Sequence, residues 1–120
     1  MRVLIVQSKT ELAQYWGEHL QGLGWDVSIA QDQASAITIL QTYPVQIMLL
    51  DLMLCNGAAL AVADYAGFRQ PLLRVVFVTD TAVFSDGSIF QHCANACAFL
   101  QSATPVADLA ALVEHHACAA

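Results

Sequence analysis

The stretch Ile47–Leu54, "IMLLDLML", places one carboxylate, that of Asp51, inside an otherwise unbroken apolar run. An unpaired carboxylate buried among apolar side chains costs several kcal/mol of folding free energy. Asp51 therefore lies at the solvent-facing end of a strand, or it takes part in chemistry. The rest of the sequence has to decide between these two interpretations.

Strand-like and helix-like segments alternate along the chain. The predicted strands cover residues 2–6, 25–30, 46–50, 73–78 and 97–101, and the third of them ends at Asp51. The predicted helices begin at the cap Thr10, at the cap Asp32, near Ala58, near Ser88 and after Thr104-Pro105, and they end at Gly22 and Gly24, near Tyr43-Pro44, at Arg69, at Cys93 and near His116. Five β-α units predict a single α/β domain over residues 1–120, with a doubly wound five-stranded parallel sheet and helices on both faces. In such sheets, ligands and chemistry lie at the carboxyl ends of the strands, where Asp51 is placed.

Composition excludes several classes of function. The chain has 120 residues and a net charge of −6, and its fixed positive charges are Arg2, Lys9, Arg69 and Arg74. Four scattered cations do not form a basic stripe, so we expect no direct binding of nucleic acid. No apolar run is long enough for a membrane span, and Met1–Val6 is too short for a signal peptide, so a cytoplasmic protein is expected.

The cysteines allow an alternative based on metal or redox chemistry. Cys55, Cys93, Cys97 and Cys118 are read as reduced, partly buried thiols, since no secretory signal indicates an oxidising compartment. Cys93 and Cys97, with His92 before them and His115-His116 near the end of the chain, fit the spacing of a zinc site only loosely. A redox- or metal-responsive module using Cys93 and Cys97 is kept as the least favoured alternative.

The sequence resembles the receiver domain of two-component response regulators over nearly its whole length. The resemblance is carried by "RVLIVQS" at the first strand, "IMLLDLML" at the third, "VVFVTD" at the fourth and "AFLQS" at the fifth. It implies a flavodoxin-like fold with strand order 2-1-3-4-5. In this family, the aspartate that ends the third strand accepts a phosphoryl group from a histidine kinase. Two acidic residues after the first strand help to bind Mg²⁺, and a Thr or Ser and a Lys contact the phosphoryl oxygens.

The residues of this chain match that pattern only in part. The resemblance makes Asp51 the phosphoacceptor position and Thr79 and Phe99 the switch positions. Four positions of the predicted pocket depart from the family: Gln7 and Ser8 replace the acidic pair, Ser102 replaces the lysine, and Asp80 replaces a small residue.

Gln7, Ser8 and Ser102 remove metal ligands or positive charge from the predicted pocket, and Asp80 adds a negative charge. Mg²⁺ prefers oxygen ligands that include carboxylates, and phosphoryl transfer depends on positioning and on neutralising the transferring group. Since Asp51 alone keeps its carboxylate, we expect weak or no Mg²⁺ binding, no other cofactor, and impaired phosphorylation.

The sequence therefore predicts an atypical receiver that acts as a regulatory protein–protein interaction module and is not an enzyme. Its expected partners are a histidine kinase, an effector domain or another regulator. A homodimer through the fourth helix, fifth strand and fifth helix is also expected, because "CANACAFL" and "ADLAALVEHHACAA" make that face small and apolar. The alternative function is a working phosphorelay receiver that is phosphorylated at Asp51.

Overall fold

The computed structural model describes residues 2–51, 59–70, 73–79, 96–101 and 105–118. A five-stranded sheet forms its centre, with the strand order β2-β1-β3-β4-β5 and all strands parallel. The strands are β1 Arg2–Val6, β2 Asp26–Ala30, β3 Ile47–Asp51, β4 Arg74–Thr79 and β5 Ala96–Gln101. The helices are α1 Thr10–Gly22, α2 Gln33–Thr42, α3 Ala59–Arg69 and α4 Val106–Cys118. The predicted fold class, strand order and parallel sheet are confirmed.

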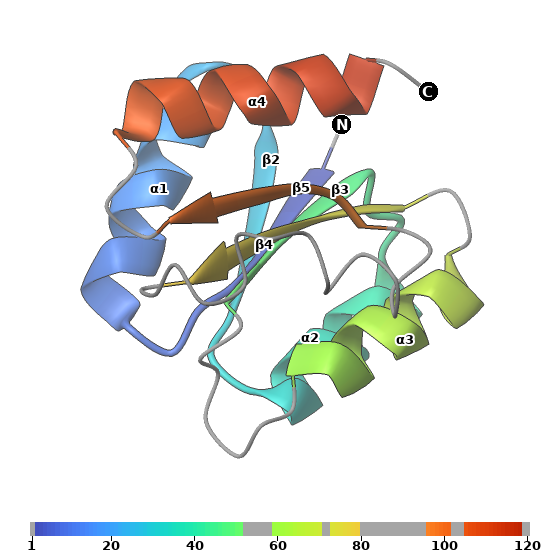
Figure 1. The fold of residues 1–120 in the computed structure, drawn as a ribbon. Helices are drawn as coiled ribbons and strands as arrows, with labels where there is room; N and C mark the ends of the chain where they lie inside the picture. Colours follow the sequence, from blue (N-terminus) through green and yellow to red (C-terminus); the bar gives the residue numbers. More distant parts are fainter. Residues whose placement is uncertain (1, 52–58, 71–72, 80–95, 102–104, 119–120) are drawn as a thin grey trace.

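Helices cover both faces of the sheet (Figure 1). On one face, α1 and α4 pack through Trp16, Leu20 and Leu109 onto the inward side chains of β1 and β3. On the other face, α2 and α3 pack through Leu40 and Val62 onto the alternate residues of the same strands. This arrangement follows from the period of two in a strand, which sends neighbouring side chains to opposite faces. Every residue of β3 is buried, as expected of a central strand covered on both sides.

The observed boundaries differ from the predicted ones by about a residue at most strand ends. Asp51 ends β3 as predicted, and Thr79 is the last residue of β4, whereas it was expected just after that strand. The predicted helix near 88–93 lies outside the described residues. No helix in the described part of the chain is long and apolar enough to cross a membrane.

Two of the predicted helix ends can be compared with their caps. Asp32 caps α2 as expected, because its carboxylate accepts a hydrogen bond of 2.8 Å from the Ser35 N–H. The prediction that Thr10 caps α1 is wrong, since Lys9 occupies that position without a side-chain cap and Thr10 is the first helical residue. The Thr10 hydroxyl instead accepts a hydrogen bond of 2.6 Å from the Gln31 amide.

The turn from α1 into β2 depends on one glycine. Gly24 has a φ of 98°, a conformation that residues with a Cβ rarely adopt. Its N–H donates to the carbonyl of Gln21, and the Trp25 N–H donates to the carbonyl of Leu20. The expected helix end at Gly22 and Gly24 is therefore present in the structure.

Candidate functional site

The carboxyl ends of the three central strands bring Asp51, Gln7 and Thr79 to one edge of the sheet. Val6 pairs with Leu50, and Gln7 and Asp51 follow these two residues on neighbouring strands. On the other side of β3, Asp51 pairs with Val78, which directly precedes Thr79. The register thus places the predicted acceptor position between the residues that end β1 and β4.

Asp51 is buried rather than solvated. Only 4% of its surface is exposed, although it is the last residue of its strand. Burial of a carboxylate is costly unless hydrogen bonds or opposite charges compensate it. Among the described residues, no buried side-chain nitrogen or oxygen lacks a hydrogen-bond partner. The interpretation of Asp51 as a solvent-exposed strand end is therefore excluded.

Gln7 is the second buried polar side chain at this edge, with 1% of its surface exposed. Its backbone N–H donates to the Ala30 carbonyl at 3.0 Å, which extends the pairing of β1 with β2 by one residue. Its side-chain oxygen Oε1 accepts a hydrogen bond of 3.2 Å from the Lys9 N–H. Gln7 therefore closes the turn into α1 with the atom that a metal ligand at this position would need.

The remaining predicted pocket residues are placed less completely. Ser8 lies in the bend between β1 and α1 and is half-buried. Phe99 lies within β5, where it pairs with Phe77 of β4. Asp80 and Ser102 lie outside the described residues.

The described residues do not form the metal or redox site that was proposed for Cys93, Cys97 and the histidines. His92, Cys93 and Cys55 lie outside the described residues, Cys97 lies in β5, and Cys118 ends α4. His115 is an exposed residue of α4. Within the described ranges, no three His, Cys, Asp or Glu side chains are grouped so that they could hold a metal ion.

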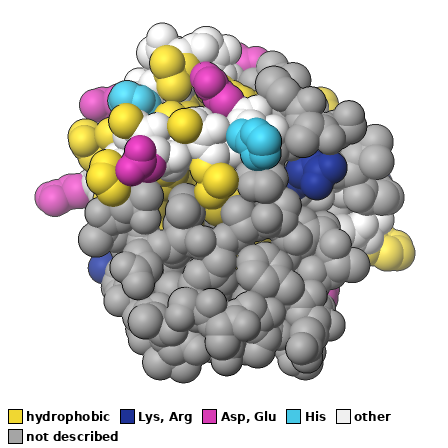
Figure 2. All heavy atoms as spheres, turned by 45° about the horizontal axis from the view of Figure 1, so that its top comes forward, with side chains coloured by type: hydrophobic (Ala, Val, Ile, Leu, Met, Phe, Trp, Pro, Cys, Tyr) yellow, Lys and Arg dark blue, Asp and Glu magenta, His cyan; other side chains and the backbone are white. Residues whose placement is uncertain are grey.

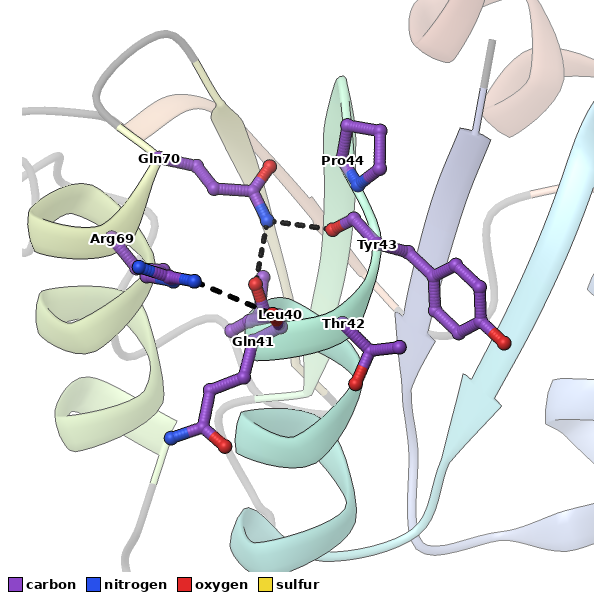
Figure 3. Close-up of a pocket in the computed structure, with 7 residues that line it drawn as sticks. All are labelled: Leu40, Gln41, Thr42, Tyr43, Pro44, Arg69 and Gln70. Atoms are coloured by element: carbon purple, nitrogen blue, oxygen red, sulfur yellow. Dashed lines mark hydrogen bonds between the residues drawn. The ribbon is translucent and has the colours of Figure 1, made fainter.

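A hollow of about 300 Å³ lies at the opposite edge of the sheet, between the ends of α2 and α3 (Figure 3). Its central side chain, Gln70, donates to the carbonyls of Leu40 at 2.9 Å and Tyr43 at 2.8 Å. The Gln70 side-chain oxygen accepts a hydrogen bond of 2.7 Å from the Val45 N–H. Beside it, Arg69 reaches the Gln41 carbonyl at 3.4 Å. These side chains form hydrogen bonds with backbone groups at the end of α2 and before β3. The residues around the hollow therefore have a structural role, which is to connect the end of α3 to the end of α2.

Sequence reasoning missed both Gln70 and the bond between Gln7 and Lys9. A glutamine before Pro71 carries no recognisable pattern, because its three partners lie 25 to 30 residues away. The hydrogen bond between Gln7 and Lys9 spans only two residues, but the resemblance to receiver domains predicts only the loss of an acidic charge at Gln7. The only available signal was the position of a long amide side chain directly after a buried strand.

No protein family model and no curated protein matches the sequence. Solved structures do match its fold. A response regulator receiver domain protein from Methanospirillum hungatei shares 20% identity at a TM-score of 0.87, with 97% of this chain and 92% of that chain covered. A response regulator from Thermotoga maritima shares 17% identity at a TM-score of 0.84, over 98% and 97% of the two chains.

A third match is to a structure that contains a phosphorylated aspartic acid. A response regulator protein from Burkholderia pseudomallei, with a phosphorylated aspartic acid, a calcium ion and citrate, shares 18% identity. Its TM-score is 0.81, and the match covers 95% of this chain and 71% of that chain. At these identities the likeness concerns the fold, and we conclude that this chain has the fold of response regulator receiver domains.

Proposed function

We propose that this chain is a regulatory receiver-like module that works through protein partners, and that its phosphorylation at Asp51 with Mg²⁺ is impaired. The observation that carries the proposal is the pair of buried side chains at the carboxyl edge. Asp51 lies where the resemblance puts a phosphoacceptor. The neighbouring Gln7 side chain is neutral, and its Oε1 accepts a hydrogen bond from the Lys9 N–H.

The engaged amide makes Gln7 a poor replacement for an acidic metal ligand. To bind Mg²⁺ through the same lone pair, its oxygen would have to leave the Lys9 N–H and give up a hydrogen bond of 3.2 Å. A lost hydrogen bond of this kind costs about 1 kcal/mol. A neutral amide oxygen also binds Mg²⁺ more weakly than a carboxylate oxygen does, because the ion prefers charged oxygen ligands. Both effects lower the affinity for Mg²⁺ in the same direction.

The test is phosphorylation of the purified chain by acetyl phosphate with Mg²⁺, followed by mass spectrometry of the intact protein. We expect no phosphoryl adduct on the natural chain. The double variant Gln7→Asp/Ser8→Asp restores the acidic pair, and we expect it to gain an adduct that disappears when Asp51→Asn is added. Stoichiometric aspartyl phosphate on the natural chain would overturn the proposal.

The second candidate function is a working phosphorelay receiver. It is favoured by the placement of Asp51 and Thr79 at the ends of neighbouring strands and by the phosphorylated aspartate of the Burkholderia pseudomallei protein of similar fold. A kinase-dependent adduct on Asp51 that needs Mg²⁺ would support this function and exclude the first.

A homodimer through the face of the predicted fourth helix, fifth strand and fifth helix is part of the proposal, and α4 is the last of these helices. The outer side of α4 combines small apolar residues with a few charged ones, as the space-filling view of this face shows (Figure 2). Ala107, Asp108, Ala111 and Glu114 are all exposed residues of α4. Light scattering after size exclusion tests the dimer, and a monomer at high micromolar concentration contradicts it.

A further inference from the structure

Strand β2 forms one outer edge of the sheet, because it pairs with β1 alone in the order β2-β1-β3-β4-β5. The Gln7 N–H donates to the Ala30 carbonyl, so Ala30 directs its backbone groups toward β1. In a parallel ladder this role alternates along the strand. Ser28 and Asp26 therefore also face β1, and Val27 and Ile29 direct their N–H and C=O groups away from the sheet.

A groove runs beside this edge between β2 and α1. It has a volume of about 420 Å³, and it is lined by Gln14, Gly17, Glu18, Gln21, Val27 and Ile29. Gly17 lets the helix approach closely, because a Cβ there would lie 3.3 Å from both Ile29 Cδ1 and Val27 Cγ1. The apolar side chains of Val27 and Ile29 thus form the floor, and Ile29 remains 37% exposed.

The charge of the groove selects among occupants. Glu18 lies in its wall, Asp26 is exposed at the start of the strand, and the lining contains no lysine or arginine. A second copy of the chain would bring another net charge of −6 to this edge. An extended segment of another protein with basic side chains fits better, because its backbone pairs with the edge and its charges face Glu18.

We propose that the β2 edge binds an extended, basic segment of a partner protein by strand addition. The backbone of the segment pairs with the outward groups of Val27 and Ile29. The side chains on its α1 side, apolar and basic in turn, enter the groove beside Gly17 and face Glu18. This surface is separate from the carboxyl edge with Asp51, and the inference stands whether or not Asp51 is phosphorylated.

The test uses the full chain and a short blocked peptide. Threonine occupies every second position of the peptide, and valine and lysine take turns at the positions between, so that valine and lysine lie on one face of the strand. Binding is followed by backbone amide chemical shifts and amide hydrogen exchange. We expect shifts and protection at Val27 and Ile29. A peptide in which glutamate replaces lysine is the charge control and should bind far more weakly. Glu18→Gln should weaken binding a few-fold and reduce its dependence on salt.

Two further changes separate strand addition from simple contact with the groove. Val27→Pro removes an outward N–H that the β1 ladder does not use, and proline is tolerated at such edge positions. We expect it to weaken binding by about tenfold, since it removes a hydrogen bond and disturbs the next one, whereas Val27→Thr should retain binding. N-methylation of the peptide, either at the threonines or at the valines and lysines, tests the same pairing without altering the protein, and only one of the two peptides should lose binding.

The proposal is overturned if the parent peptide does not bind, or if both methylated peptides bind as well as the parent. Equal binding of the glutamate peptide contradicts the charge argument. Protection of Val27 and Ile29 that depends on the concentration of the chain alone would show that a second copy occupies the edge instead.

Discussion

At the amino edge of the sheet, polar side chains hold the backbone together, whereas at the carboxyl edge two polar side chains are buried among the strand ends. Gln70 binds three backbone groups near the start of β3, and the side-chain oxygen of Gln46 accepts a hydrogen bond of 2.6 Å from the Arg2 N–H. Gln7 and Asp51 are instead almost wholly inaccessible. The difference shows that one edge serves stability, while the other keeps a carboxylate whose burial has a cost.

The largest effect is expected at the amino edge. Gln70→Ala removes three hydrogen bonds to backbone groups and should lower the free energy of unfolding by about 3 kcal/mol, at roughly 1 kcal/mol for each bond. Urea denaturation measures this change. Gln41→Ala is the control, because its exposed side chain lines the same hollow without a comparable role. Equal stability of the two variants would mean that the hydrogen bonds of Gln70 do not stabilise the fold.

The next effect concerns the carboxyl edge. Gln7→Asp places a second carboxylate beside Asp51 and should lower the free energy of unfolding by roughly 2 kcal/mol without metal, because a like charge is added in a buried place. Mg²⁺ should recover part of this loss by binding to the folded state. Thermal melts with and without Mg²⁺ measure both changes.

Gln33→Asp is the control for that experiment, since it adds the same charge at the exposed start of α2. It should change stability by less than about 0.5 kcal/mol, and Mg²⁺ should have no effect on it. If Gln7→Asp melts like the natural chain in the absence of Mg²⁺, the edge is better solvated than its burial indicates.

A smaller effect is expected at the turn that leads into the amino end of β2. Gly24→Ala forces a Cβ into a backbone conformation with φ of 98° and should cost about 1 kcal/mol. Gly22→Ala provides the matched control, because a Cβ at Gly22 meets no atom within 4 Å and its φ is not positive. Urea denaturation of both variants should show a loss for the first alone.

The smallest effect is a pH dependence at the cap of α2, on the carboxyl side. The hydrogen bonds from Ser35 hold the pKa of Asp32 below its usual range. A carboxylate with a lowered pKa stabilises the folded chain at pH values above its unfolded pKa of about 3.9, and this contribution disappears as the pH falls through the folded pKa.

Melting curves of the natural chain and of Asp32→Ala from pH 7 down to pH 3 measure this difference. The natural chain should be the more stable of the two at pH 7, and the difference should shrink below about pH 4. Asp32→Asn keeps a capping oxygen without the charge, so its stability relative to Asp32→Ala should not change over this range. A constant difference between the natural chain and Asp32→Ala would show that the cap does not depend on the charge.

The sequence predicted the sheet because its signals are local and repeated. Buried runs such as Arg2–Val6, a cap at Asp32 and a glycine at position 24 each specify a short piece of backbone, and the short connections leave few topologies. It also predicted which edge carries Asp51. The Thr10 cap was wrong because α1 begins one residue earlier than the capping preference indicates, with Lys9 at the cap position and Thr10 as the first helical residue.

The burial of Asp51 and Gln7 and the hydrogen bonds of Gln70 could not be predicted from the sequence. Whether Asp51 is solvated depends on segments from three strand ends, and whether Gln7 is available depends on where the Lys9 N–H points. Gln70 finds partners in α2 and before β3, far away in the sequence. Such contacts follow from tertiary packing, which periodicity and capping rules do not describe.

Strand β3 is paired on both sides and all its residues are buried, which has a consequence for motion at Asp51. The amide protons of such a strand are expected to exchange with water only when the whole chain unfolds. Asp51, at the end of this strand, is therefore expected to be as rigid as the core. We expect any conformational change near Asp51 to be a movement of the surrounding chain relative to this residue.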